Sequence, residues 1–220
     1  MFTEAEIKQW NERWRGKPAA EIVEWAIVLA KGRAVVTTNF RPYEAVLLHL
    51  ATRVQPDIPV LWVDHGWNRP ATYRHAAELT RQLRLNLKVY APSMTVARYQ
   101  ALHGAPPTPE QEEALRQFSQ IFKLEPFQRA MRELAPTVWL TALRRVQNPH
   151  RAGMEIVAPD THLGVVKVSP LLEWTDDQME GYVKEHHLPV EWDYFDPAKG
   201  DEKRECGLHV RWGKTTEKES

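Results

Sequence analysis

The chain has 220 residues, and its 29 lysine and arginine residues are balanced by 29 aspartate and glutamate residues, giving no formal net charge. This balance argues against a protein that mainly coats nucleic acid or an anionic membrane. A single cysteine excludes an internal disulfide and a cysteine-ligated metal cluster. The charged start "MFTEAEIKQW" gives no sign of a secretory signal, and no apolar stretch approaches the length of a membrane span. We therefore expect a soluble, cytoplasmic protein.

Helical and extended patterns alternate along the first part of the chain. Residues 17–32 have apolar side chains at helical spacing, with Pro18 near the start and Gly32 at the end, and this predicts a helix. The β-branched run "RAVVTT", residues 33–38, predicts a strand. After the turn-like "NFRP", helical periodicity returns from Tyr43.

The same alternation continues further along the chain. The continuous apolar run "IPVLWV", residues 58–63, is typical of a strand that is covered on both faces. A helix is predicted over residues 70–83, a third strand over residues 85–92 and a fourth over residues 137–143. This pattern predicts an α/β fold with a parallel sheet and helices on both faces.

Two regions differ from this alternation. The proline-rich "HGAPPTPEQEE" predicts a surface loop that leads into a helix at Pro109. After a predicted helix over residues 175–187, the chain from Pro189 onward shows no convincing element. We interpret this last segment as a flexible C-terminal tail that carries the lone cysteine.

Polar segments follow the first, second and fourth predicted strands, where an open parallel sheet binds its ligands. After the first strand, the backbone and the hydroxyls of Thr37 and Thr38 could bind an anion. A simple turn, with Asn39 close to the helix start, explains the same residues equally well. After the second strand, Asp64 could accept hydrogen bonds from a base or sugar beside Gly66, or it could simply cap the next helix.

The segment after the fourth strand, "RRVQNPHR", places several cations in one loop of a neutral protein. Arg144, Arg145 and Arg151 carry guanidinium groups, which suit phosphate and sulfate oxygens. A solvated basic loop is the alternative interpretation. We favour an anion site, because the loop leaves a strand end on the predicted ligand side.

Several segments of the sequence resemble the phosphoadenosine phosphosulfate (PAPS) reductase family, which also contains the adenosine phosphosulfate (APS) reductases. The similar stretches are "PDIPVLWVDHGWNRPATYRHAAELTRQLRLNLKVY", "KLEPFQRAM" from Lys123, "ALRRVQNPHRA" from Ala142 and "KRECGLH" from Lys203. Together they cover roughly residues 33–209. The last stretch is the most specific, because it places the rare cysteine in a fixed basic, acidic and glycine context.

The resemblance implies an adenine-nucleotide α-hydrolase-like (Rossmann-like) fold, with residues 1–188 forming the nucleotide-binding domain, N-terminal helices within residues 1–32, and a catalytic tail over residues 189–220. It implies thioredoxin-dependent reduction of 3'-phosphoadenylyl sulfate to sulfite and adenosine 3',5'-bisphosphate, in assimilatory sulfate reduction. Cys206 would attack the sulfur and form an S-sulfonate, which thioredoxin or glutaredoxin would then reduce. It also implies a homodimer. No cofactor is expected, since one cysteine cannot hold the iron–sulfur cluster of the APS reductases.

The resemblance and the strand-end positions together predict the site residues. Cys206 and His209 are the predicted catalytic pair, and Lys203, Arg204 and His209 would lower the pKa of the Cys206 thiol. The predicted substrate-binding residues are Thr37, Thr38, Asn39, Phe40, Asp64, Gly66, Lys123, Arg144, Arg145, Gln147, Arg151, Lys203 and Arg204. No metal ligands are predicted.

The chain departs from the family pattern in two places. Arg41 stands in the first loop where the family's Ser-Ser-Phe-Gly has glycine. The stretch "WDYFDPAKGDEKREC" runs almost directly into the cysteine, so a family segment before the tail is missing. These departures leave open a paralogue of the same fold that binds an adenylate without reducing it, or that transfers sulfur.

Overall fold

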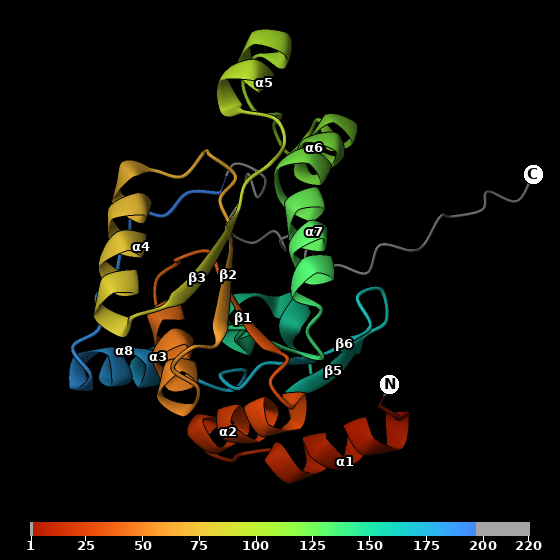
Figure 1. The fold of residues 1–220 in the computed structure, drawn as a ribbon, viewed down its shortest axis with the longest axis vertical. Coiled ribbons are helices and arrows are strands. Elements are labelled where there is room, and N and C mark those ends of the chain that lie inside the picture. Colours follow the sequence, from red (N-terminus) through yellow and green to blue (C-terminus); the bar gives the residue numbers. More distant parts are fainter. Residues whose placement is uncertain (1, 197–220) are drawn as a thin grey trace, which may run out of the picture.

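A six-stranded sheet with the order β3-β2-β1-β4-β6-β5 organises residues 2–196, the part of the chain that the computed structural model describes (Figure 1). The strands are β1 (Ala34–Thr38), β2 (Pro59–Val63), β3 (Asn86–Tyr90), β4 (Val138–Leu140), β5 (Val157–Asp160) and β6 (Val165–Val168). All neighbours pair in parallel except β5 and β6, which form an antiparallel hairpin. The predicted parallel sheet is therefore confirmed for β1, β2, β3, β4 and β6, and the sheet is mostly rather than wholly parallel, because β5 adds an antiparallel edge strand.

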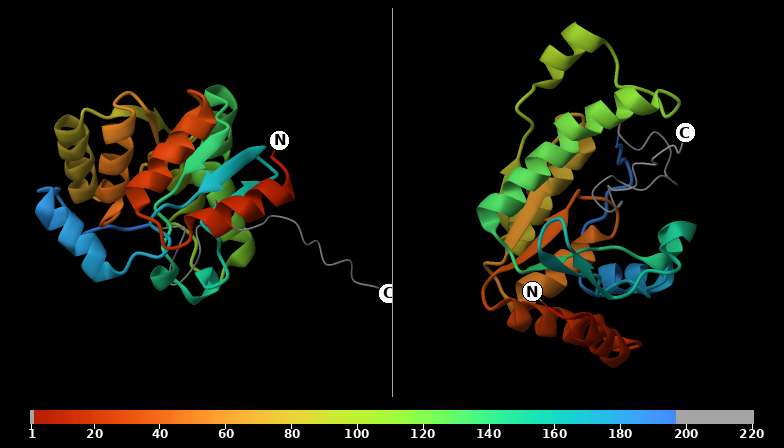
Figure 2. Two further views of the ribbon diagram at one scale, coloured as in Figure 1. Left: turned by 90° about the horizontal axis from the view of Figure 1, so that it is seen from below. Right: turned by 90° about the vertical axis from the view of Figure 1, so that its right-hand side faces the viewer.

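Helices cover both faces of this sheet (Figures 1 and 2). The larger core joins strand residues such as Val36 and Val60 to one set of helices, whereas Val35 and Leu61 face the other side, toward Phe127. Successive strand residues point to opposite faces, so a continuous apolar strand serves both cores. The larger core includes residues of α1 (Glu4–Trp14), α2 (Ala19–Ala30), α3 (Glu44–Val54), α4 (Pro70–Leu83) and α8 (Asp176–Glu185), and the other face is covered by α7 (Glu125–Leu134).

Most predicted elements correspond to observed ones, with shifted ends. The predicted helix over residues 17–32 is α2, and the predicted fourth strand over residues 137–143 shrinks to the three residues of β4. The helix expected at Pro109 begins at Glu112 instead, because Thr108–Gln111 form a turn, closed by a bond from the Gln111 N–H to the Thr108 carbonyl.

A helical lobe rises beyond the carboxyl ends of the strands (Figure 1). It contains α5 (Val96–His103) and α6 (Glu112–Ser119), which continues through a π-helical turn (Gln120–Leu124) into α7. The aromatic rings of Tyr99, Phe118 and Phe122 form its own small core, against which Trp67 packs. π-Helical turns are rare and occur often at functional sites.

After α8 the chain returns to the carboxyl-end side of the sheet, and Figure 1 shows it in blue, rising beside α4. We name residues 190–196 the strap. The strap is the first part of the tail predicted over residues 189–220, and the rest of that tail, with Lys203, Arg204, Cys206 and His209, lies outside the described residues. Within residues 2–196, no helix combines the length and the apolar character that crossing a membrane requires.

Candidate active site

A cleft lies at the carboxyl ends of β1, β2 and β4. The chain proceeds from β1 to β2 and β3 on one side, while β4 pairs with the other edge of β1, so the strand order reverses between β1 and β4. Such a reversal separates the loops that follow the two strands and opens a crevice between them. The polar residues that line the cleft are Thr37, Thr38, Asn39, Arg41, Glu44, Thr141, Gln147, Arg151 and Tyr194.

The loop after β1 contributes Thr37, Thr38 and Asn39 to the cleft, as predicted from their position at a strand end. The Thr37 hydroxyl oxygen accepts a hydrogen bond from Trp139 Nε1 at 2.9 Å, which fixes its rotamer at the cleft floor. Phe40, also a predicted site residue, is fully buried instead. Its ring packs edge-on against Trp62, with 5.0 Å between the centroids, and so anchors the loop to the core.

Arg41 occupies the position where the resemblance gives glycine. The positive φ angles of this loop fall on Phe40 (55°) and Tyr43 (69°), so the backbone at Arg41 does not require glycine. The Arg41 guanidinium lies over the ring of Tyr194, 5.4 Å from its centroid, and both residues line the cleft. The departure from the family pattern therefore adds a cation to the cleft.

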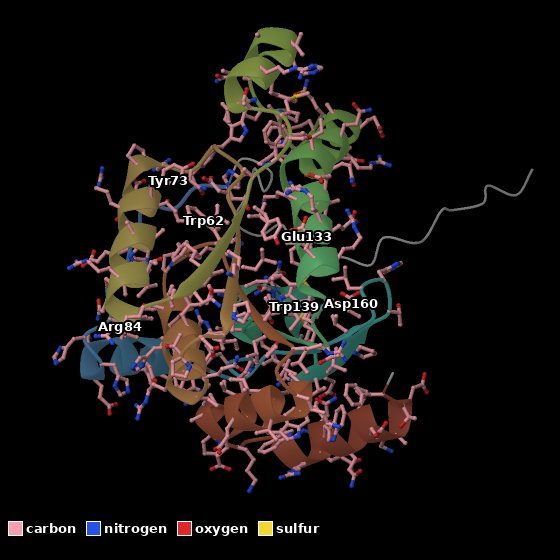
Figure 3. All side chains as sticks on the ribbon, viewed as in Figure 1. Trp62, Tyr73, Arg84, Glu133, Trp139 and Asp160 are labelled. Carbon is pink, nitrogen blue, oxygen red and sulfur yellow. The ribbon has the colours of Figure 1, made fainter. Side chains whose placement is uncertain are left out.

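Asp64 and Gly66, after β2, are not among the residues that line the cleft. Asp64 Oδ1 accepts hydrogen bonds from the Gly66 N–H at 3.0 Å, from Asn68 Nδ2 at 3.0 Å and from the Tyr73 hydroxyl at 2.8 Å. Burial, together with this bond to Asp64, raises the pKa of Tyr73 to about 12. Tyr73 lies on α4 beside Trp62 (Figure 3). In this structure Asp64 organises its own loop.

Gly66 has a steric reason to be glycine. Its φ is +75°, and a Cβ there would lie 2.9 Å from Val96 Cγ2 at the start of α5. The loop after β2 and the helical lobe thus approach closely at this point.

The arginines of the basic loop after β4 fall into two groups: Arg144 and Arg145 do not line the cleft, whereas Arg151 does. Arg144 is buried, donates to the Trp174 carbonyl and to Asp176 Oδ1, and lies over the Tyr43 ring. Arg145 donates to the Met154 carbonyl at 2.7 Å and to Glu173 at 3.0 Å. Neither is among the cleft-lining residues, and their bonds tie this loop to Met154, to the chain just before α8 and to the start of α8.

Gln147 and Arg151, by contrast, do line the cleft. They lie in two short 3₁₀ turns, Arg145–Gln147 and Pro149–Arg151, and the Arg151 guanidinium donates to Gln147 Oε1. Arg151 follows β4 and Arg41 follows β1, and both residues line the same cleft. The cleft therefore presents guanidinium groups from two loops, which suits a ligand with more than one anionic group.

Lys123 projects from the π-helical turn into a buried cluster. It forms an ion pair with Asp196 at the end of the strap, and both residues are only 7% exposed. His65 lies in the same cluster, where burial first and the Lys123 charge second lower its pKa to about 4. Its Nδ1 accepts the Trp67 N–H at 3.1 Å, so the ring is neutral with its proton on Nε2.

The strap is the feature that the sequence did not reveal. Trp192 packs edge-on against Tyr43, Asp193 pairs with Arg69, and Tyr194 lies under Arg41. Phe195 contacts Arg69, and Asp196 reaches Lys123. The only available signal was that "WDYFD" consists of aromatic and acidic residues, which complement the cations that it contacts.

Comparison with known proteins assigns this arrangement to a family. The family model described as "Phosphoadenosine phosphosulfate reductase domain" matches residues 33–195. The chain belongs to this family. A Synechococcus sp. protein named phosphoadenosine 5'-phosphosulfate reductase is 37% identical over 93% of this chain and 97% of its own length. A protein of the same name from Xylella fastidiosa is 36% identical over 84% of this chain and 86% of its own length.

Solved structures agree on the fold of this PAPS reductase family member. A crystal structure of PAPS reductase from Candida auris, in a phosphate complex, superposes with a TM-score of 0.75 and 21% identity, over 86% of this chain and 90% of that one. An NH3-dependent NAD synthetase from Campylobacter jejuni, in complex with nitrate, gives a TM-score of 0.53 at 11% identity, over 83% of this chain and 74% of that one. The adenine-nucleotide α-hydrolase-like fold is thereby confirmed.

Proposed function

We propose that this protein reduces 3'-phosphoadenylyl sulfate to sulfite and releases adenosine 3',5'-bisphosphate, a step of sulfate assimilation. The observation that carries the proposal is the strand-end cleft at the β1/β4 reversal, with Arg41 and Arg151 among its lining residues. A nucleotide with a 3'-phosphate and a 5'-phosphosulfate matches two guanidinium groups in one cleft. The two curated relatives are named for this activity, and the chain matches 97% and 86% of their lengths.

The reacting group in this proposal is Cys206, in "KRECGLH". Its thiolate attacks the sulfur of the substrate, the bond from sulfur to the bridging phosphate oxygen breaks, and the bisphosphate leaves with that electron pair. The enzyme is left as a cysteine S-sulfonate. Lys203, Arg204 and His209 flank the thiol in the sequence and favour its thiolate form, which is the nucleophilic form.

The S-sulfonate has to be reduced from outside, because the chain has no second cysteine. A thiolate of thioredoxin or glutaredoxin attacks Cys206 Sγ, sulfite leaves, and a mixed disulfide forms. The partner's second thiol then resolves that disulfide, so the dithiol supplies both electrons and ends as a disulfide. We propose no iron–sulfur cluster or other cofactor, and a homodimer as the working assembly. The cytoplasm is the compartment in which such a thiol cycle stays reduced.

Two loops of the cleft would bind the nucleotide, and the strap leads toward the reacting thiol. The β1 loop and the short turns after β4 would hold the nucleotide's anionic groups through Arg41 and Arg151. The strap, which ends at Asp196, leads ten residues later to Cys206. Ten residues span at most about 35 Å when fully extended, which is enough to bring a thiol to a substrate in the cleft.

Sulfite release measured side by side with 3'-phosphoadenylyl sulfate and adenylyl sulfate, with thioredoxin supplied, tests the proposal. We expect sulfite from the former. Binding of adenosine 3',5'-bisphosphate without sulfite release from either substrate would instead support a non-reductase paralogue. Persulfide or thiosulfate chemistry without consumption of a sulfonucleotide would support sulfur transfer.

A further inference from the structure

Every backbone N–H between β1 and Pro42 donates to a side chain within residues 38–44. The N–H groups of Asn39 and Arg41 both donate to Glu44 Oε2, at 2.7 Å and 3.3 Å. The Phe40 N–H donates to the Thr38 hydroxyl at 2.9 Å, and that hydroxyl donates to the same Glu44 oxygen at 2.8 Å. Pro42 has no N–H to offer. The loop therefore surrounds one carboxylate oxygen with three donors.

The shape of this loop is that of an anion-binding concavity. Phe40 is left-handed, with φ 55°, and the residues on either side of it are not; with this alternation the Asn39 and Arg41 N–H groups point at the same Glu44 oxygen. Tyr43, also left-handed with φ 69°, then directs the chain into α3. Phe40 and Tyr43 are non-glycine residues with left-handed backbone angles. This conformation is strained and persists only where the surrounding structure holds it. Here the buried Phe40 ring and the Glu44 carboxylate hold the loop from its two sides.

We propose that Glu44 is a positioning residue for substrate binding: its carboxylate occupies the anion concavity of the β1 loop and so orients Arg41 toward the cleft. This inference rests on the proposed function. With the backbone donors already engaged, substrate anions meet the side chains of the loop rather than its N–H groups. The fixed Arg41 N–H keeps that side chain beside Tyr194, where it lines the cleft together with Arg151.

An ordinary helix-stabilising role is the competing explanation. Glu44 is the first residue of α3, where any carboxylate interacts favourably with the helix dipole. However, the bonds of its Oε2 run to the loop before the helix and not to the N–H groups of α3. Glu21, the third residue of α2, offers a control, since it is exposed and its carboxylate also lies in the first turn of a helix.

The test compares Glu44→Ala, Glu44→Gln, Glu44→Asp and Glu21→Ala. Two quantities are measured: the melting temperature with sodium formate or sodium chloride at equal ionic strength, and the dissociation constant of adenosine 3',5'-bisphosphate. Formate is small enough to replace the missing carboxylate in Glu44→Ala. We expect formate to raise the melting temperature of this variant more than chloride does, and to leave the wild type and Glu21→Ala unaffected.

The dissociation constant of the bisphosphate tests whether Glu44 positions the binding site. We expect Glu44→Ala to weaken bisphosphate binding about tenfold or more, as losing a charge-assisted contact would, and formate to recover much of the loss. Glu44→Gln should weaken binding without formate recovery, because the amide still fills the space. Glu44→Asp should bind weakly too, since its shorter side chain withdraws the oxygen, and Glu21→Ala should bind as the wild type does.

The outcomes separate this inference from the proposed function. If the wild-type protein does not bind the bisphosphate, the proposed function is contradicted. The effect of formate on the melting temperature of Glu44→Ala still decides whether the Glu44 carboxylate fills the concavity. Unchanged affinity in Glu44→Ala, or a loss that formate and chloride affect equally, overturns the positioning role. Should Glu44→Ala fail to fold, unchanged bisphosphate affinity in Glu44→Gln overturns it as well.

Discussion

Lys123 and Asp196 form a buried ion pair that joins the π-helical turn of the lobe to the end of the strap. Their side chains are only 9% and 3% exposed. Burying two charges costs solvation free energy, and the pair offsets that cost only while both partners are present. The pair therefore fixes the point from which the chain continues toward Cys206.

Removing one partner should destabilise this region far more than removing an exposed pair. In Asp196→Asn the Lys123 ammonium remains buried without its counter-charge, and we expect the free energy of unfolding to fall by at most about 3–5 kcal/mol. Detachment of the strap, which would let water reach Lys123, limits the loss. Urea denaturation followed by tryptophan fluorescence measures it.

Asp193→Asn is the matched control on the same strap. Asp193 pairs with Arg69, but their side chains are 49% and 50% exposed, and exposed pairs contribute about 0–1 kcal/mol. Equal effects from the two substitutions would mean that the Asp196 pair is hydrated and does not anchor the strap.

His65 should make the protein less stable in mild acid. Burial and the nearby Lys123 charge lower the pKa of His65 from 6.5 to about 4, with Asp196 and Asp64 acting in the opposite direction. Between these two values the unfolded chain binds a proton that the folded protein does not, so stability falls as the pH decreases from 6.5 to about 4. The full effect is about 3 kcal/mol.

The substitution His65→Asn removes this titration and preserves the acceptor for the Trp67 N–H, because asparagine forms the same local turn. We expect a shallower decline of the unfolding free energy over that pH window. His162→Asn, at an exposed position, is the control and should leave the profile unchanged. If both variants follow the wild-type profile, His65 does not contribute to the acid sensitivity.

Substitutions of the arginines that line the cleft should affect nucleotide binding differently from substitution of Arg145, which does not line it. Arg151→Ala and Arg41→Ala each remove a cleft-lining guanidinium, and we expect bisphosphate binding to weaken about tenfold or more. Added salt should weaken wild-type binding as well. Arg145→Ala should leave affinity nearly unchanged and lower stability, because Arg145 donates to Met154 and Glu173. A loss of affinity in Arg145→Ala as large as in Arg151→Ala would show that the β4 loop rearranges when it binds the nucleotide.

The sequence predicts the parts of this molecule that depend on local pattern. Apolar runs and strand-end polar residues predict β1 to β4 and the edge at which the cleft forms, and Thr37 to Asn39 line it as their position suggests. Composition also identifies the cluster of arginines after β4. It does not show which of them face the cleft, because that depends on partners such as Asp176, which follows Arg144 by 32 residues.

The strap and the Glu44 contacts are harder to foresee for the same reason. "WDYFD" has neither helical nor strand periodicity, and its contacts lie far back in the sequence, for example at Arg69, 124 positions before Asp193. Glu44 reads in the sequence as an ordinary acidic residue at a helix start. Its role emerges only when the left-handed Phe40 brings the loop N–H groups around its carboxylate.

Cys206→Ser is the decisive substitution for the proposed chemistry. Serine nearly preserves the size of the side chain but does not supply a thiolate, so we expect sulfite formation to be abolished. Bisphosphate affinity should stay close to that of the wild type, because the proposed nucleotide contacts come from Arg41 and Arg151. Sulfite release and calorimetric titration, run on the same preparations, measure the two quantities.

Mass spectrometry without reductant tests the intermediate itself. Wild-type protein incubated with 3'-phosphoadenylyl sulfate should gain the mass of one SO3 group and release one equivalent of bisphosphate, and then stop, since no second cysteine can resolve the S-sulfonate. Reduced thioredoxin should remove the added mass as sulfite and restart turnover. Cys206→Ser should show neither the added mass nor the single release of bisphosphate. Substantial turnover in that variant, or an SO3 group on another residue, would refute Cys206 as the nucleophile while leaving the cleft as the nucleotide site.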